Sequence, residues 1–364
     1  MEIKQNTLYL TTQGSYVNRD HLNLRIEVDH ELKLSVPIHH LESICVFGQS
    51  TVTPGAAELC WKHGVPVNYF SENGYFIGRW EGVANTSVTL RRAQFRAADD
   101  PRRCASISRQ IVAGKLQNSR QSLLRSARES DSAEEGERLQ SAASEISRLL
   151  RLLERCLSPE GEPDAGIEEF HLDPEETSAV DQIRGYEGHG ASVYFGVFSL
   201  HLRQQREDFV FTTRGRRPAR DRVNCLLSFL YALVRHDCIA ALTATGLDPF
   251  VGYLHTERPN RPALALDLME EFRPLIADRL AITLINRRQV GVKDFVVREG
   301  GAVEFTKEGR KSVIAAYQSR KQETVRHPML NQDFRFGQLM LVQARILARH
   351  LRGDLGEYLP CVLR

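Results

Sequence analysis

Hydrophobic and polar residues alternate along the first 90 residues of the chain. The alternation predicts strands at 22–28 and 32–36, because a period of two is typical of a strand with one buried face. An unbroken apolar run at 44–47 indicates a strand buried on both faces. The runs 65–70 and 75–80 flank Asn73-Gly74, which favours a hairpin because both turn positions tolerate positive φ. Thr53, Pro54 and Gly64 predict one short helix before that hairpin.

From residue 91 onward the apolar spacing becomes helical. It predicts helices at 102–128, 139–153, 221–245, 263–286 and 336–352. Asp173-Pro174 predicts the start of another helix, which ends near Arg184. Pro274 lies inside a predicted helix and should kink it. Residues 303–306 predict a brief β excursion, and the segment 158–169, rich in proline, glycine and acids, predicts a surface loop.

These patterns predict an α+β protein with two domains, since 364 residues exceed the usual size of one hydrophobic core. We place a small, sandwich-like β domain with one short helix at 1–90. A larger, mostly α-helical domain follows at 91–364 and includes an acidic helix-loop region around 126–176.

Composition narrows the function classes. The net charge is only +2, so a nucleic-acid surface would require local clusters of arginine. Seven cysteines without a CxxC pair fit a reducing cytoplasm and argue against a zinc ribbon or an iron–sulfur cluster. The N-terminus has no signal-peptide pattern. The longest apolar stretch, 225–245, is interrupted by Arg235, His236 and Asp237, and predicts a buried helix rather than a membrane span.

Glu187 lies among three glycines, Gly185, Gly188 and Gly190. Each glycine costs about 1 kcal/mol relative to alanine inside a helix. Such a cost suggests the close approach of a ligand or of another backbone, where a carboxylate could reach a cation. The alternative is a turn between two helices with a solvated glutamate.

Asp267, Glu270 and Glu271 share one face of a predicted helix. Like charges at i, i+3 and i+4 repel each other, and a cation or an arginine partner would relieve the repulsion. The alternative is a solvated acidic face that is balanced by Arg273 and Arg279.

His255 ends the segment 246–255, in which Asp248-Pro249 predicts a short helical turn. A lone histidine is more often structural than a ligand. Together, however, Glu187, His255 and Glu270 offer two carboxylates and an imidazole with no thiolate. This set suits Mg²⁺ or Mn²⁺, and such a cation can polarise a phosphoryl oxygen.

Arginine is concentrated at several places that could contact a DNA backbone, because its guanidinium group binds phosphate in a bidentate manner. Most arginines on a protein surface are simply solvated, so only the densest group is favoured as functional. The candidates for DNA binding are Arg214, Arg216, Arg217, Arg220 and Arg222, with Arg258 in the loop after His255.

The ordered set of motifs resembles a known family, the CRISPR-associated endonuclease of spacer acquisition, also called the adaptation integrase. The resemblance covers nearly the whole chain and is greatest to members from type I systems. The matching segments are Gly185-Tyr186-Glu187-Gly188, Gly246-Leu247-Asp248-Pro249, Gly252-Tyr253-Leu254-His255, Leu266-Asp267-Leu268-Met269-Glu270-Glu271-Phe272-Arg273-Pro274, and the segments 218–228 and 343–353.

The resemblance implies roles for these residues. Glu187, His255 and Glu270 correspond to the metal ligands of the family, Asp267 to an accessory acid that orients the site, and Glu271 to a bystander. The β domain is implied to mediate homodimerisation, and the helical domain to be catalytic. The partners implied are double-stranded DNA and a small ferredoxin-like adaptation protein.

The implied reaction is the attack of a prespacer 3′-hydroxyl on a phosphodiester at the edge of a repeat. Two alternatives stay open: a metal-dependent nuclease that cuts branched DNA without integration, and a non-catalytic DNA-binding scaffold. The acidic region matches no motif of the family, so its role is also open.

Overall fold

The structure is a computed structural model that describes residues 7–41, 43–72, 76–80, 82, 88–156, 178–215 and 218–363. It divides the chain into two compact units, residues 1–86 and 87–364. The first unit is rich in strands and the second is mostly helical, so the predicted α+β class is confirmed.

In the described part of the first unit there are two four-stranded sheets, one α-helix and a short 3-10 helix at Ile38–His40. One sheet has the order β1-β5-β7-β8, in which β1, β5 and β7 are parallel and β8 is antiparallel to β7. The other has the order β4-β3-β2-β6. The elements are β1 (Thr7–Leu10), β2 (Tyr16–Asp20), β3 (Asn23–Val28), β4 (Glu31–Pro37), β5 (Ser43–Phe47), β6 (Thr51–Val52), α1 (Pro54–Lys62), β7 (Val67–Phe70) and β8 (Phe76–Trp80).

The local signals of the first unit explain its fold. Every residue of β5 is buried, as expected of an unbroken apolar strand. The Thr53 side chain accepts a hydrogen bond from the backbone of Ala56 and caps α1. Strands β7 and β8 pair antiparallel, as the hairpin signal predicted. The predicted turn residues Asn73 and Gly74 lie outside the described residues. The pattern did not predict β1 and β2.

The second unit is built from α-helices with two short hairpins. A π-helical segment joins α7 to α8. The elements are α2 (Val88–Ala98), α3 (Pro101–Arg128), α4 (Ala133–Arg155), α5 (Ala179–Gly196), α6 (Arg222–Thr245), α7 (Ala263–Phe272), α8 (Arg279–Asn286), β9 (Phe295–Val297), β10 (Val303–Phe305), α9 (Lys307–Gln322), β11 (Thr324–Arg326), β12 (Asp333–Arg335) and α10 (Phe336–Leu351).

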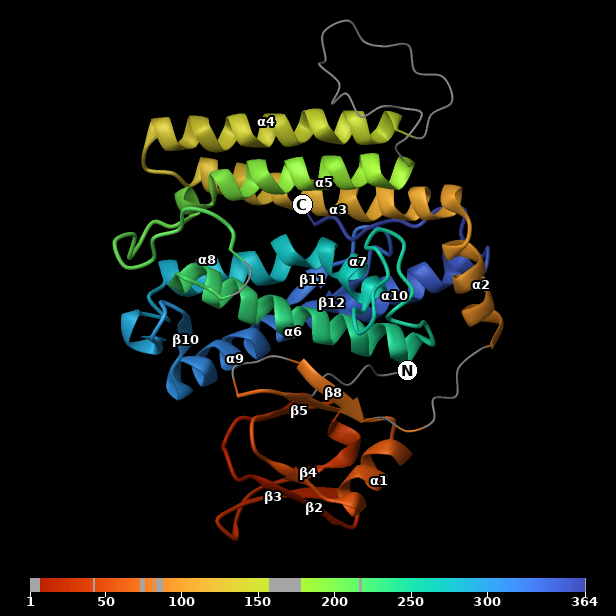
Figure 1. Cartoon of the computed structure of the whole chain (residues 1–364), viewed down its shortest axis with the longest axis vertical. Helices are drawn as coiled ribbons and strands as arrows, with labels where there is room; N and C mark the ends of the chain where they lie inside the picture. The colour runs from red at the N-terminus through yellow and green to blue at the C-terminus, as the bar shows by residue number, and fades with distance from the viewer. Residues whose placement is uncertain are drawn as a thin grey trace, which may run out of the picture. The chain divides into compact units, whose positions relative to one another are not determined.

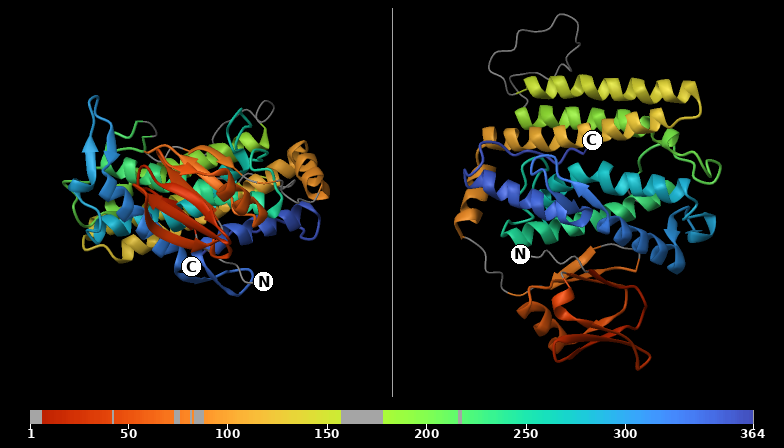
Figure 2. Two further views of the ribbon diagram at one scale, coloured as in Figure 1. Left: turned by 90° about the horizontal axis from the view of Figure 1, so that it is seen from below. Right: turned by 180° about the vertical axis from the view of Figure 1, so that it is seen from behind.

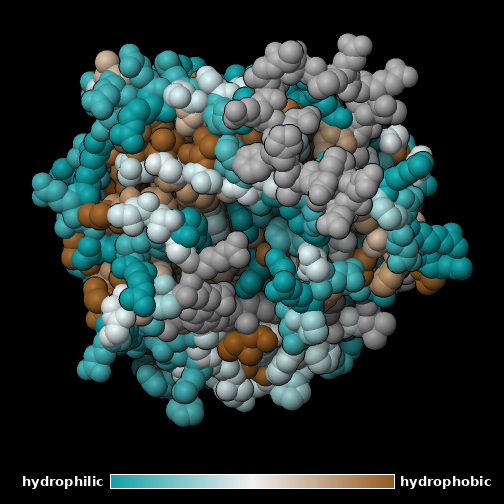
Figure 3. Space-filling view, turned by 45° about the horizontal axis from the view of Figure 1, so that its top comes forward, coloured by the Kyte–Doolittle hydropathy of each residue, from teal (hydrophilic) through white to brown (hydrophobic). Residues whose placement is uncertain are grey.

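Helices α3, α4 and α5 lie side by side in one layer of this unit, and the views from the front and from behind agree on this (Figures 1 and 2). Helix α6 packs against α7 and α10. Among the described residues, α6 alone is long and apolar enough to cross a membrane by length and composition, and 67% of its most apolar window is buried inside the protein. On the face seen in Figure 3, hydrophilic side chains predominate and hydrophobic ones form small patches.

Two predictions for the helical unit were wrong in detail. The helix expected to end near Arg184 continues through the glycines to Gly196, and Ser178 caps its start; the predicted start at Asp173-Pro174 lies outside the described residues. Residues 248–255 form turns and bends rather than a helical turn, because the Asp248 side chain accepts from the Phe250 backbone and closes a tight turn. Helices α2 and α9 and the hairpin β11–β12 were not predicted.

Burial of His201 makes the helical unit sensitive to pH. The imidazole is 1% exposed and its Nδ1 lies 2.6 Å from Ser126 Oγ. Burial lowers the pKa of His201 to about 4, while an unfolded histidine has a pKa of about 6.5. Between these pH values the unfolded chain binds one more proton, so stability falls as the pH falls from 6.5 toward 4.

We therefore expect His201→Gln to flatten the pH dependence of unfolding. Wild type should lose up to roughly 1.4 kcal/mol more per pH unit than the variant across this window. Urea unfolding at a series of pH values measures the difference. Parallel curves for the two proteins would show that His201 titrates alike in the folded and unfolded chain.

Candidate active site

Three helices of the second unit bring charged side chains to one point. Lys115 of α3 forms ion pairs with Glu187 of α5 and with Glu270 of α7; its Nζ lies 2.7 Å from Glu270 Oε2. His255 approaches the same carboxylate, with Nε2 3.8 Å from Glu270 Oε1. Asp267 holds the other side of the histidine ring. The structure thus brings together all four predicted site residues, while their assignment as ligands and orienting acid stays a prediction.

Lys115 is a site residue that the sequence analysis missed. It falls on the buried face of α3, four residues after Ile111, and its side chain is only 8% exposed. Burial by itself would lower the pKa of the Lys115 ammonium, but the charges of Glu270 and Glu187 outweigh burial and raise it. The group is therefore a permanent cation. The available signal was a lysine inside an otherwise apolar helical stripe.

One glycine near Glu187, Gly190, lets α5 pack closely on its neighbours, whereas nothing lies within 4 Å of a Cβ built at Gly188. A Cβ at Gly190 would collide with the Leu116 side chain of α3, and Leu149 of α4 lies 3.6 Å away on the same side. A close approach by another segment is what the glycine pattern suggested. Glu187 itself is 27% exposed and contacts Lys115 one helical turn from this packing point. The alternative of a turn between two helices is excluded, since α5 is continuous here.

Asp267 fixes the loop that carries His255. Its Oδ2 accepts from the backbone N–H groups of Tyr253 (2.7 Å) and Leu254 (3.1 Å). Its Oδ1 accepts from the His255 backbone (2.9 Å) and lies 2.7 Å from His255 Nδ1. Gly252 is required for this approach, because a Cβ there would lie 2.8 Å from the Ala263 backbone. With a proton on Nδ1, the lone pair of Nε2 is on the side of Glu270.

Glu270 is 1% exposed and lies in a cationic environment. Its Oε1 is 3.0 Å from Arg273 Nη1. Burial would raise the pKa of Glu270, but the charges of Arg273, Lys115 and His255 outweigh burial and lower it to about 2. Arg273 begins the π-helical segment Arg273–Asp278, where Pro274 cannot donate a backbone hydrogen bond. The predicted irregularity at Pro274 is thus a widened turn that directs Arg273 back toward Glu270.

A second group of residues, Tyr231, Asp278 and Arg214, lies around Arg273. Its guanidinium group lies 4.9 Å from the centre of the Tyr231 ring. The Tyr231 hydroxyl donates to Asp278 Oδ1 at 2.6 Å, and burial raises the pKa of Asp278 to about 6. Arg214 lies over the same ring at 5.2 Å. Arg273 is therefore held by an ionic contact with Glu270 and by a cation–π contact with Tyr231.

Glu271 forms no hydrogen bond or ion pair with the residues of this cluster among the described contacts, and its structural role was not predicted. It is fully buried and anchors the C-terminal segment: the Tyr358 hydroxyl and the Cys361 backbone both donate to its carboxylate, the latter at 2.8 Å. Burial raises the pKa of Glu271 to about 7. With Asp267 and Glu270 also buried, the alternative of a solvated acidic face is excluded.

The predicted DNA-binding arginines differ in their surroundings. Arg214 donates to Asn224 Oδ1 (2.6 Å) and Ser228 Oγ (3.1 Å), contacts inside the protein that give no support to a role in DNA binding. Arg222 donates to the Asp208 carbonyl. Arg220 and Arg258 are exposed, and their role stays a prediction. Arg216 and Arg217 lie outside the described residues.

The site combines three carboxylates with the cations Lys115 and Arg273 around one imidazole. In the part of the chain that the structure describes, no three His, Cys, Asp or Glu side chains stand ready to hold a metal ion as they are. The Lys115 ammonium occupies the position between the carboxylates of Glu187 and Glu270. The site is therefore a pair of carboxylates, Glu187 and Glu270, with the Lys115 ammonium group as the counterion between them.

Comparison with known proteins identifies the family. The model of the CRISPR associated protein Cas1 family matches residues 8–319. The chain is also 46% identical over 364 residues to CRISPR-associated endonuclease Cas1 1 of Moorella thermoacetica, and the alignment covers 100% of both chains. The chain belongs to the Cas1 family. The resemblance drawn from the ordered motifs is thereby confirmed, and the Cas1 match extends over both units.

Solved structures share the Cas1 fold. The chain is similar to a casposase bound to integration product, with a TM-score of 0.79 and 22% identity over 98% of this chain and 93% of that one. It is also similar to a chain of a Cas6-RT-Cas1–Cas2 complex, with a TM-score of 0.78 and 23% identity over 100% of this chain and 37% of that one. At these identities the likeness shows the fold alone.

The contacts of Asp267 predict a large effect of its removal. In Asp267→Ala, three backbone N–H groups and the His255 ring lose their buried acceptor, which should cost about 3 kcal/mol or more. Urea unfolding measures the loss, and nitrogen NMR of the His255 ring reports whether Nδ1 still carries the proton.

The matched control is Asp248→Ala, because Asp248 accepts from a single backbone N–H in the same loop. It should cost about 1 kcal/mol and leave the tautomer of His255 unchanged. Equal losses for the two variants would contradict the positioning role of Asp267.

Proposed function

We propose that this Cas1 protein is a metal-dependent DNA endonuclease that integrates prespacer DNA into a CRISPR repeat array in the cytoplasm. The observation that carries the proposal is the convergence of Glu187, His255 and Glu270, from three separate segments, in a chain 46% identical to a CRISPR-associated endonuclease. That a casposase of the same fold is bound to an integration product supports integration over simple cleavage.

The donor set supports a divalent cation at this point. Glu270 Oε2 is buried and accepts no hydrogen bond of good geometry from the described residues, although the Lys115 ammonium is 2.7 Å away. His255 has its Nδ1 held by Asp267, as is usual for a histidine that binds metal through Nε2. Two carboxylates and one imidazole suit Mg²⁺ or Mn²⁺, so Glu187, Glu270 and His255 would hold the ion.

The residues of the chain prepare this site for phosphoryl transfer. When bound, the cation would polarise a phosphoryl oxygen and stabilise charge on the attacking and leaving oxygens. Arg273 keeps Glu270 in its carboxylate form, and Asp267 keeps the proton on Nδ1 of His255. In the proposed reaction a 3′-hydroxyl gives up its proton as its oxygen forms a new bond to phosphorus, while the bond to the 3′-oxygen of the target strand breaks and that oxygen takes up a proton.

The proposed partners are double-stranded DNA, a second copy of the chain, and a small ferredoxin-like Cas2 protein. A solved Cas6-RT-Cas1–Cas2 complex contains a chain of this fold, which supports the last of these. Exposed leucines on or beside β3 and β4, Leu22, Leu32 and Leu34, give the first unit an apolar surface of the kind that a homodimer would cover.

Strand transfer tests the proposal directly. A labelled duplex with a free 3′-hydroxyl is given to the protein, with and without Cas2, on a supercoiled plasmid that carries a repeat in Mn²⁺. Glu187→Gln, His255→Ala and Glu270→Gln should each reduce joining by more than the roughly 10–100-fold typical of losing a supporting residue of a metal site. All three should still bind DNA.

Glu135→Gln is the control, since Glu135 of α4 binds Arg206 and does not contact the site. Joining by His255→Ala would reject the site assignment. If the wild type cleaves DNA but gives no joined product, the nuclease alternative is favoured. If it gives neither a cleaved nor a joined product, the scaffold alternative is favoured.

Lys115 provides a test that does not depend on activity. Lys115→Met leaves two carboxylates without their cation and should destabilise the protein by about 3–5 kcal/mol. The control is Lys321→Met, because Lys321 is equally buried (7% exposed) and pairs with Asp237 at 2.7 Å.

Calorimetry with and without Mn²⁺ compares the two variants. Mn²⁺ should raise the melting temperature of Lys115→Met well above any effect on Lys321→Met, because the ion replaces the missing charge between Glu187 and Glu270. An equal response to Mn²⁺ would place the metal elsewhere.

A further inference from the structure

A buried network of polar side chains adjoins the candidate active site. Its members are Asn118 of α3, Glu271 of α7, His327 in the turn between β11 and β12, Gln343 of α10, and Tyr358; none of them is more than 2% exposed. Every polar atom of these five side chains has a hydrogen-bond partner. A fully satisfied buried network holds its members in one arrangement, because a displacement would leave buried polar groups without partners.

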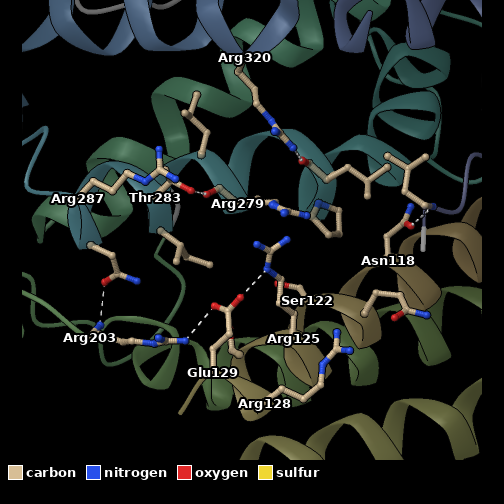
Figure 4. A pocket seen from close by; sticks show the side chains of 18 of the residues that line it. Asn118, Ser122, Arg125, Arg128, Glu129, Arg203, Arg279, Thr283, Arg287 and Arg320 are labelled. Atoms are coloured by element: carbon tan, nitrogen blue, oxygen red, sulfur yellow. Dashed lines mark hydrogen bonds and ion pairs between the residues drawn. The ribbon is translucent and has the colours of Figure 1, made fainter. Parts of the chain in front are cut away.

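Asn118 joins three segments of the chain. Its Nδ2 donates to the backbone carbonyl of Glu271 at 3.1 Å and to that of Cys361 at 2.8 Å. Its Oδ1 accepts from the backbone N–H of Leu363 at 3.2 Å. Asn118 and Leu363 line the pocket shown in Figure 4, where the last of these bonds is drawn as a dashed line. Helix α3 is thereby fastened both to α7 and to residues 358–363, which follow α10 without forming a helix or strand.

Gln343 fixes the carboxylate of Glu271 from α10. The backbone N–H of Leu330 donates to His327 Nδ1 at 3.2 Å, so the ring proton is on Nε2, which donates to Gln343 Oε1 at 3.0 Å. This bond orients the Gln343 amide so that its Nε2 donates to Glu271 Oε2 at 3.1 Å. The Tyr358 hydroxyl donates to the other oxygen of the carboxylate. Both oxygens of Glu271 are thus held in place.

The network lies on the two helices that carry Lys115 and Glu270. Lys115 is three residues before Asn118 on α3, and Glu270 directly precedes Glu271 on α7. Residues three apart on a helix lie on neighbouring parts of one face. The hydrogen bond from Asn118 to the Glu271 carbonyl therefore joins α3 to α7 about one helical turn from the place where the Lys115–Glu270 ion pair joins them.

Close packing at Gly114 adds a second contact on the same face of α3. Gly114 directly precedes Lys115, and a Cβ there would lie 2.6 Å from Cβ of Pro360 and 3.3 Å from Cγ of Glu271. A residue with a side chain would push α3 away from the 358–363 segment. Since Asn118 is four residues after Gly114, the contacts with this segment flank Lys115 on both sides.

Glu270 needs such support from outside its own helix. Helix α7 has only ten residues and passes directly into the π-helical segment, and most of the stability of a short helix comes from tertiary packing. Ligands of a metal ion must be held within about 0.5 Å of the productive geometry. The hydrogen bonds of the network hold the residue next to Glu270 from α3, from α10 and from the 358–363 segment.

We propose that Asn118 and Tyr358 are positioning residues, which hold Glu270 beside Lys115 and Glu187 at the place that a divalent cation requires. They act through Glu271 and not by contact with the cation or with DNA. The part of this inference that concerns the cation rests on the proposed function, whereas the positioning of Glu270 beside Lys115 does not.

Amine labelling in EDTA tests the positioning in the absence of metal. Acetylation followed by mass spectrometry compares Lys115 with Lys321, whose side chain is equally buried and also ion-paired. Both should react slowly in wild type. Asn118→Ala and Tyr358→Phe should raise the labelling rate of Lys115 by roughly tenfold, the change that corresponds to the loss of one buried hydrogen bond, and leave that of Lys321 unchanged.

Two variants are matched controls. Asn286→Ala also removes three hydrogen bonds to backbone groups, but at the end of α8. Tyr317→Phe removes a buried hydroxyl that donates at 2.7 Å to Asp237, the partner of Lys321. Neither control should change the labelling of Lys115, and Tyr317→Phe should instead raise that of Lys321. If Asn118→Ala fails to fold, Tyr358→Phe decides the test, because it removes a single oxygen atom.

Mn²⁺ binding tests the consequence for the site. Electron paramagnetic resonance of free Mn²⁺ gives the Kd for each protein, with Glu270→Gln as the variant that lacks a ligand. Asn118→Ala and Tyr358→Phe should raise the Kd by about 10-fold, the lower end of the range for residues that support a metal site, while the controls keep it. Melting temperatures should fall alike in the positioning variants and their controls, so that lower stability alone does not account for a weaker affinity.

The outcomes separate this inference from the proposed function. If Asn118→Ala and Tyr358→Phe match their controls in the labelling of Lys115 and in Mn²⁺ affinity, while Glu270→Gln loses Mn²⁺, the positioning role is wrong and the metal site stands. If Glu270→Gln binds Mn²⁺ as tightly as wild type, the proposed function fails. Faster labelling of Lys115 in the two variants would still support the network as the device that positions Glu270.

Discussion

The helical unit depends on one buried ionic contact, in which Lys115 of α3 lies between Glu187 of α5 and Glu270 of α7. Taking these charges out of water costs several kcal/mol per ion, and mutual attraction repays that cost only when the geometry is good. Each buried charge of this contact therefore depends on further charged or polar groups beside it. Arg273 and His255 complete the surroundings of Glu270. Glu187 keeps partial exposure, which reduces its share of the desolvation cost.

Several departures from regular structure gather around this contact. The π-helical segment turns Arg273 toward Glu270, and the absence of a side chain at Gly252 lets the His255 loop close onto Asp267. Gly190 allows α3 and α5 to approach near Glu187. Each feature is unfavourable by local propensity alone. Their concentration at one place is expected where a site imposes geometry that regular helices do not provide.

Local signals in the sequence were sufficient for much of the fold, including α1, α6 with its caps, and the alternating strands β3 and β4. These local signals did not predict the features that depend on contacts between residues far apart in the sequence. Nothing near Glu271 indicates that Tyr358 and Cys361, about 90 residues later, convert it into a buried anchor. The continuation of α5 past Arg184 follows its packing against α3, whereas its Ser178 cap is local and accepts from the Asp181 backbone. Lys115 was visible only as an interruption of an apolar stripe, which a single sequence cannot separate from a lysine that extends to solvent.

The near-neutral total charge of the chain conceals a helix, α3, whose charged residues are all basic. Its buried middle presents Lys115 to two carboxylates, whereas at its C-terminal end Arg125 pairs with Glu129. Helix α4, in the acidic region that matched no motif, covers the other side through Leu139, Ile146 and Leu149. Its Glu145 lies 3.1 Å from His189 of α5, and its Glu135 binds Arg206. The acidic residues of α4 thus pair with cations of α5 and of the segment that follows it, and this is one reason why so many basic residues leave the total charge close to zero.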